Sequence, residues 1–148
     1  MIIKLAGLFI GLVSFSLLIE VPKNFLVATG AVGAVGGLVF EACADLLQMG
    51  NVAASFFSAL VVAFLSHMLA RKFKAPVTLF LVAGILPTVP GAGMYRIVYS
   101  MIMEGSKLTG YYFVETIEIA GVIALAIFLM DSVFRVFKKG WRQKFMRS

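Results

Sequence analysis

The sequence has few charged residues for its length. Only 14% of its 148 residues are Asp, Glu, Lys or Arg, whereas about a quarter is usual for a soluble domain. The apolar residues make up 61% of the chain, form several long runs and give a mean hydropathy of +1.03. These properties exclude an ordinary soluble domain and predict an all-α integral membrane protein. The chain is too short for two domains of usual size, so we expect one membrane domain over residues 1–148.

Cysteine and histidine each occur once, as Cys43 and His67. A single cysteine excludes an internal disulfide framework, and a lone histidine cannot complete a set of metal ligands. A membrane enzyme would need a nucleophile paired with a base, or such a ligand set, at membrane depth. The sequence therefore predicts no enzyme activity, no catalytic residue, no metal and no cofactor.

Five apolar runs approach or exceed the roughly 20 residues that span a hydrocarbon core. They predict membrane helices over residues 2–19, 25–47, 52–69, 77–103 and 113–137. The stretches EVPKN, QMGN, ARKFKAP and EGSKLTGYY separate them. The first run has a basic flank like that of a signal peptide, but SFSLLIEVPKN lacks the small-x-small cleavage pattern. A retained first helix is therefore favoured.

Basic residues fall unevenly on the two sides of this five-helix arrangement. Ten of the thirteen lie on one side: Lys23, Arg71, Lys72, Lys74, Arg135, Lys138, Lys139, Arg142, Lys144 and Arg147. The other side has Lys4 and Lys107, while Arg96 lies inside the fourth run. The positive-inside rule then predicts an external N-terminus and a cytoplasmic C-terminus. A re-entrant hairpin at residues 77–103 would remove this bias, so a crossing is favoured.

The C-terminal segment 132–148 has an aromatic stripe at helical spacing. The stripe comprises Phe134, Phe137, Trp141 and Phe145, with basic residues between them. Such a segment lies at the headgroup level of a membrane, and we expect an amphipathic extension that contacts phospholipid headgroups. With no soluble domain, the net charge of +6 indicates phospholipid rather than nucleic acid. Asp131, one turn before Arg135, is predicted to form a local ion pair with it.

Charged residues inside membrane helices are costly and usually face a bundle interior or a pathway. Glu41 and Asp45 of the second helix, Arg96 of the fourth, and Glu115 and Glu118 of the fifth are predicted to share one depth. Two interpretations stay open: Arg96 pairs with one of these carboxylates, such as Glu41, or it contributes to a binding site. Asp45 and Glu115 are close enough to a helix end to meet water.

Glycines four residues apart occur in GLFIG (residues 7–11) and GAVGG (residues 33–37). This spacing permits a close approach between helix backbones. One interpretation of this spacing is ordinary helix packing. The other concerns the second helix, which has small residues on much of its surface and would lie beside a moving element or a cavity.

The fourth run is interrupted near its middle by ILPTVPG, residues 85–91. Proline deletes a backbone donor and clashes with the preceding turn. At about 1.5 Å per residue, residues 76–86 rise roughly 16 Å, half of a 30 Å core, so the break is predicted to lie near the midplane. A break at that depth leaves amides unpaired at the start of the second half-helix and carbonyls unpaired at the end of the first.

These unpaired groups suit a substrate that carries a carboxylate. Thr88 adds a hydroxyl and Arg96 a positive charge close to the break. We therefore predict a substrate-binding site formed by Pro87, Thr88, Pro90, Gly91, Arg96 and Glu41. The alternative is a proline kink that serves packing alone.

With these features the sequence resembles the threonine/serine exporter family, specifically the short subunit of its split form. The resemblance rests on chain size, the five-run pattern, the turn at Val21 and Pro22, the glycine-rich second helix and ILPTVPG. The resemblance implies a ten-helix transport unit in a bacterial plasma membrane, completed by a larger membrane subunit. Two related five-helix halves would be inverted relative to each other, because an odd number of helices reverses the orientation. Members of the family are associated with export of threonine and serine, and some split pairs with export of succinate.

Taken with the resemblance, the sequence predicts a subunit of a secondary transporter that exports small carboxylates or amino acids, threonine/serine-like or succinate-like. Its predicted partner is the larger subunit of the same family, or failing that a second copy in a homo-oligomer. The alternatives are a non-transporting assembly subunit and a channel-like protein, although no ring of repeated filter residues is evident.

Overall fold

The computed structural model describes residues 2–103 and 106–145, which are chiefly helical. Its six α-helices are α1 (Ile2–Leu18), α2 (Leu26–Glu41), α3 (Asn51–Phe73), α4 (Val77–Ile85), α5 (Gly91–Met103) and α6 (Ser106–Phe145). Three short elements join or extend them: the 3-10 turns η1 (Lys23–Phe25) and η3 (Leu86–Thr88), and the π-helical η2 (Ala42–Leu46). The described part of the chain contains no strand. The predicted all-α class is confirmed.

Three helical segments are long and apolar enough to cross a membrane: Lys23–Leu46, Asn51–Phe73 and Leu108–Phe137. Segments Val77–Thr88 and Gly91–Met103 satisfy the same condition together and are bent by 46° at the break between them. Helix α1 is apolar but has 17 residues, a length of about 25 Å. The described residues thus provide three spans, or four if the bent pair is one span, and the count of five crossings stays a prediction.

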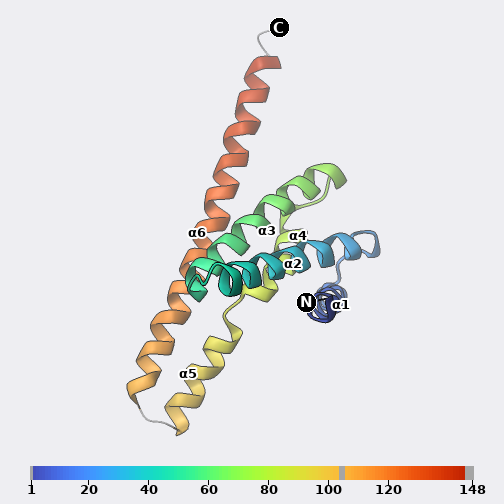
Figure 1. Cartoon of the computed structure of the whole chain (residues 1–148). Coiled ribbons are helices and arrows are strands. Elements are labelled where there is room, and N and C mark those ends of the chain that lie inside the picture. The colour runs from blue at the N-terminus through green and yellow to red at the C-terminus, as the bar shows by residue number, and fades with distance from the viewer. Residues whose placement is uncertain (1, 104–105, 146–148) are drawn as a thin grey trace.

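Several helices continue through stretches that the sequence predicts as separators. Helix α3 includes part of ARKFKAP and ends where Lys74 adopts the left-handed conformation, with φ 53°. Helix α6 begins at Ser106 rather than Phe113 and continues to Phe145 as one helix of 40 residues, the long orange-to-red helix of Figure 1. It is about 60 Å long, twice the thickness of a hydrocarbon core. Polar residues are tolerated in its terminal turns because those turns extend beyond such a core.

Helix α2 lies between α1 on one side and α3 with α4 on the other. Its glycines make this packing close: a Cβ at Gly33 would meet the side chain of Leu12 in α1, and one at Gly36 would collide with Val62 in α3. A Cβ at Gly7 or Gly11 of α1 would meet nothing within 4 Å. The predicted close approach is therefore present at GAVGG, whereas GLFIG faces open space in the isolated chain.

Buried hydroxyl groups form hydrogen bonds between α2 and the helices on both sides of it. Thr29 Oγ1 donates a hydrogen bond of 2.9 Å to Ser16 Oγ of α1. Ser58 Oγ of α3 donates one of 2.7 Å to the carbonyl oxygen of Gly36. These bonds satisfy polar groups that would otherwise be costly in an apolar interior.

Helices α3 and α6 pack against each other in parallel. Asn51 near the start of α3 contacts Glu115 in the first part of α6. His67 near the end of α3 lies beside Asp131 in the second part of α6. Between these contacts, the buried residues Ala59, Ile123 and Ala126 form the core of the interface. The two helices thus run in the same direction along their shared length.

Helix α5 packs on the N-terminal part of α6, and the two extend together away from the other helices (Figure 1). Ser100 is its buried residue, and the Ser100 and Thr109 hydroxyls share a hydrogen bond of 2.9 Å. The exposed side of α5 carries large apolar and aromatic residues: Met94, Tyr95, Val98, Tyr99, Met101, Ile102 and Met103. In the isolated chain this face has no helix packed on it among the described residues.

Candidate functional site

Residues 86–90 interrupt the helix between α4 and α5. Residues Leu86–Thr88 form a 3-10 turn, and Val89 is extended, with φ −61° and ψ 130°. The residue before a proline is restricted to this extended region. The carbonyl oxygen of Pro90 then accepts the first hydrogen bond of α5, 3.1 Å from the nitrogen of Met94. The interruption thus follows from the backbone chemistry of the PTVP segment.

A cavity of about 270 Å³ lies beside this interruption. Its lining residues are Phe40, Asn51, Ser55, Pro87, Thr88, Val89, Pro90, Ala92, Gly93, Arg96, Glu115, Thr116 and Ile119. They come from α2, α3, α5, α6 and the interruption. Four of the six predicted site residues are present: Pro87, Thr88, Pro90 and Arg96. Gly91 and Glu41 are not among the described lining residues.

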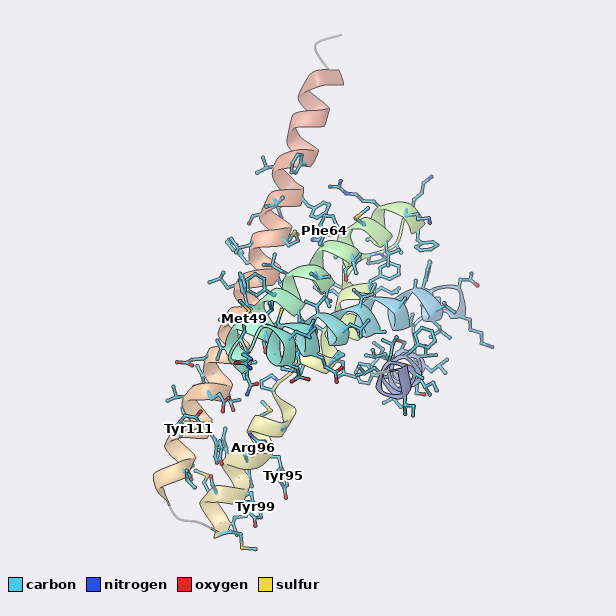
Figure 2. All side chains as sticks on the ribbon, in the orientation of Figure 1. Met49, Phe64, Tyr95, Arg96, Tyr99 and Tyr111 are labelled. Carbon is cyan, nitrogen blue, oxygen red and sulfur yellow. The ribbon has the colours of Figure 1, made fainter. Side chains whose placement is uncertain are left out.

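The positive end of the cavity comes from α5. Arg96 is exposed, and its guanidinium carbon lies 5.9 Å from the ring centre of Tyr112. Figure 2 shows Arg96 on α5 and Tyr111 on the facing segment of α6. Ala92 and Gly93 also line the cavity, and both precede the first helical hydrogen bond of α5. Amides in the first turn of a helix have no intrahelical acceptor and carry the positive end of the helix dipole.

The negative group of the cavity is Glu115 of α6. Its Oε1 accepts a hydrogen bond of 3.1 Å from Asn51 Nδ2 at the start of α3. The sequence predicts that Glu115 lies at the depth of Arg96. It also predicts that Glu115 is close to a helix end, because the last helix is expected to begin at Phe113. With α6 beginning at Ser106, Glu115 lies in the third turn and is half-buried. In the structure, Glu115 therefore lies within α6 rather than at its end, and its side chain lines the cavity.

Three hydroxyl groups line the same cavity, and each donates its proton to a backbone carbonyl. Thr88 Oγ1 donates to Ile85 at 2.8 Å, Thr116 Oγ1 to Tyr112 at 2.7 Å, and Ser55 Oγ to Asn51 at 2.8 Å. Their oxygen lone pairs are then left to accept hydrogen bonds from a ligand.

The close approach of α5 and α6 at the cavity depends on Gly93. A Cβ at this position would collide with Thr116 Oγ1. The missing side chain therefore sets the distance between the two helices at the site.

Glu41 ends α2 and is half-buried, and it is followed by the π-helical turn Ala42–Leu46. Whether it pairs with Arg96 stays a hypothesis. Within residues 2–103 and 106–145, no group of three or more histidine, cysteine, aspartate or glutamate side chains could hold a metal ion.

The fold and cavity define an α-helical membrane protein with a polar site among its helices. The chain belongs to the threonine/serine exporter family, because the family model described as "Threonine/Serine exporter, ThrE" matches residues 4–133.

Two relatives show the same likeness over 90 residues, which are 61% of this chain. One is a threonine/serine exporter of Corynebacterium glutamicum, 27% identical over 18% of its own length. Another is an uncharacterized protein of Haemophilus influenzae, 31% identical over 30% of its length. The matched region thus spans less than a third of either relative. No solved structure matches the chain at a significant level.

Proposed function

We propose that this protein is a subunit of a secondary transporter that exports small carboxylates or amino acids, and that the substrate binds in the cavity at the interrupted helix. The observation that carries the proposal is the set of groups around that cavity: Arg96, the first-turn amides of α5, Glu115 and three hydroxyls. Membership of the threonine/serine exporter family supports the same function.

Charge complementarity favours an amino acid over a dicarboxylate. The guanidinium of Arg96 and the amides at the start of α5 suit a carboxylate. The carboxylate of Glu115 and the lone pairs of the Thr88 and Thr116 hydroxyls suit an ammonium group. A second carboxylate, as in succinate, would lie close to Glu115 and be repelled by it. Threonine-like or serine-like substrates are therefore the preferred candidates.

The parallel packing of α3 and α6 supports one crossing at residues 77–103. Two helices that run in the same direction through a membrane need an odd number of crossings between them. A re-entrant loop would give an even number and an antiparallel pair. We therefore propose that α4 and α5 form one broken span, with an external N-terminus and a C-terminus in the bacterial cytoplasm.

The exposed side of α5 supports assembly with a second subunit. Arg96 lies partway along α5 and is exposed in the isolated chain. A charged side chain at this depth does not face acyl chains in a stable membrane protein. The matched relatives are also several times longer than the matched region. We propose that a larger membrane subunit of the same family covers this face, as an inverted counterpart, and that the basic tail contacts phospholipid headgroups.

An efflux assay tests the proposed function. Cells that express this chain with and without its proposed larger subunit would be loaded in turn with threonine, serine and succinate. We expect export of threonine or serine only when both subunits are present. Export of none of the three by the pair would contradict the proposal, and export by this chain alone would contradict the need for a partner.

The preference for an ammonium group is tested with Glu115→Gln. Neutralising Glu115 removes a charge-assisted hydrogen bond of about 1.5–3 kcal/mol, so threonine and serine export is expected to fall roughly tenfold or more. Glu118→Gln is the control, because Glu118 is exposed and is not among the described lining residues. Equal effects of the two substitutions would contradict an ammonium site at Glu115.

A further inference from the structure

A second cavity of about 270 Å³ lies at the other end of the α3–α6 interface. His67 and Arg71 contribute to it from the last two turns of α3, and Asp131 and Arg135 from α6. Ala75 and Val77, which also line it, place the first turn of α4 at its edge.

Positive charge exceeds negative charge in this cavity. Arg135 Nε lies 2.7 Å from Asp131 Oδ2, which confirms the ion pair predicted from the sequence. His67 Nε2 lies 3.7 Å from the other oxygen of Asp131. Of the two guanidinium groups at this cavity, that of Arg135 pairs with Asp131, the one acidic side chain among the described lining residues.

Arg71 is held in place without a carboxylate of its own. Its guanidinium carbon lies 4.6 Å from the ring centre of Phe134, and Nη2 donates a hydrogen bond of 3.3 Å to the Phe134 carbonyl oxygen. In the part of the chain that the structure describes, no ion pair joins Arg71 to an acidic side chain. His67 stacks on the same ring with centroids 4.5 Å apart. The positive charge of Arg71 is thus positioned by Phe134 and remains available to an anion.

The depth of the cavity corresponds to the headgroup layer of a membrane. It lies where α3 ends at Phe73 and α4 begins at Val77, and spanning helices end at this level. The neighbouring surface of α3, toward the membrane interior, is apolar: Phe64 and Met68 are 42% and 51% exposed. Figure 2 shows Phe64 on α3 where it passes α6. A charged cavity at the headgroup level thus adjoins an apolar surface suited to acyl chains.

We propose that this cavity binds the phosphate group of an anionic phospholipid, whose acyl chains lie along Phe64 and Met68. Guanidinium groups bind phosphate oxygens in bidentate geometry, and basic cavities between membrane helices accommodate acidic headgroups. The first turn of α4, a helix of nine residues, adds the positive end of its dipole. The cavity volume of about 270 Å³ is slightly below the roughly 300–1,000 Å³ of small-molecule sites. This size suits a lipid headgroup whose acyl chains remain outside the cavity. Phe134 and Arg135 also belong to the basic tail, residues 132–148. The cavity is nevertheless distinct from the predicted contact of that tail with the membrane surface, because His67 and Arg71 of α3 and the first turn of α4 also form it.

Native mass spectrometry of the purified full chain, with its larger subunit where the two co-purify, tests this site. The protein would be titrated with phosphatidylglycerol and, separately, with phosphatidylcholine. We expect a retained phosphatidylglycerol adduct whose apparent affinity falls roughly tenfold in Arg71→Gln, since a charge-assisted hydrogen bond to phosphate is lost. Lys72→Gln is the matched control, because it removes the same charge from the neighbouring exposed residue, which is not among the described lining residues. Its affinity should equal that of the wild type.

A second substitution keeps the test decisive if Arg71→Gln does not yield folded protein. Arg135→Gln alters a side chain that is 80% exposed, so folding should survive, and it should also weaken the phosphatidylglycerol adduct. Equal loss in Lys72→Gln would overturn the proposal in favour of general surface charge. Equal binding of phosphatidylcholine would overturn the requirement for an anionic lipid. Displacement of the lipid by millimolar inorganic phosphate would assign the cavity to a free anion instead.

Discussion

At the scale of single residues, Arg96 connects the helix interruption to the proposed substrate. It is the cationic side chain among the described residues that line the cavity, and it lies within α5 just beyond the break. Its exposure means that its charge must meet water, a substrate or another subunit rather than acyl chains. Its role is therefore open to a direct test.

Arg96→Ala is expected to lower the apparent affinity for exported substrate roughly 10- to 100-fold, because a charge-assisted contact to the carboxylate is worth about 1.5–3 kcal/mol. Expression should be maintained. Arg96→Lys, which keeps the charge but loses bidentate geometry, should lie between the alanine variant and the wild type. Concentration-dependent efflux measures the effect.

The competing hypothesis is a structural pair between Arg96 and Glu41. It predicts poor expression of Arg96→Ala, because removing one partner leaves the other charge uncompensated. It also predicts that a double neutral variant of Arg96 and Glu41 regains both expression and flux. Regained expression without flux would instead support contact between Arg96 and the substrate.

At the scale of elements, helix α2 is defined by its glycines, which face neighbours on two sides. Gly36 is the glycine best suited to a test. A Cβ there would collide with Val62, and a β-branched side chain such as valine has few alternative rotamers with which to move away. Gly36→Ala should therefore destabilise the fold by about 1–3 kcal/mol through overpacking. Gly11→Ala, at a position with nothing within 4 Å, should leave stability unchanged or slightly increase it. Thermal-shift assays of the purified chain compare the two, and equal losses would contradict the described packing.

The interruption between α4 and α5 is the element most closely tied to the proposed transport. Pro90→Ala restores a backbone donor and raises helix propensity by about 3 kcal/mol, so the helix should continue through residues 86–90 and remove the free amides at the start of α5. Folding should survive while export falls to background in efflux assays. Pro22→Ala, in the turn before α2 and away from the cavity, is the control. Normal export by Pro90→Ala would mean that the break serves packing alone.

At the scale of the whole molecule, orientation follows from combining charge distribution with helix direction. Ten basic residues on one side predict that side to be cytoplasmic, and the parallel α3–α6 pair agrees with a single crossing between them. Reporter fusions at Lys107 and Ser148 are expected to report an external and a cytoplasmic position, respectively. An external Ser148, or both fusions on one side, would contradict the proposed topology.

The fold class was predictable from the sequence because hydropathy and helical spacing are local properties. Long apolar runs specify membrane helices, since backbone polar groups in lipid must be satisfied within the segment. The limits of the helices were less predictable: α3 continues through part of the RKFK segment and α6 through most of EGSKLTGYY. Polar residues do not end a helix by themselves, whereas Pro76 and the PTVP segment do.

The sequence by itself determined the membrane class, the place of the helix interruption and the ion pair between Asp131 and Arg135. Each depends on the chemistry of neighbouring residues, proline in one case and an i, i+4 pair in another. The tertiary structure alone decided which distant side chains share a cavity. Asn51 and Glu115 are 64 residues apart and meet only because α3 and α6 pack in parallel with a particular rotation about their axes. That rotation is fixed by contacts between helices, and such contacts cannot be predicted from the local sequence of either helix.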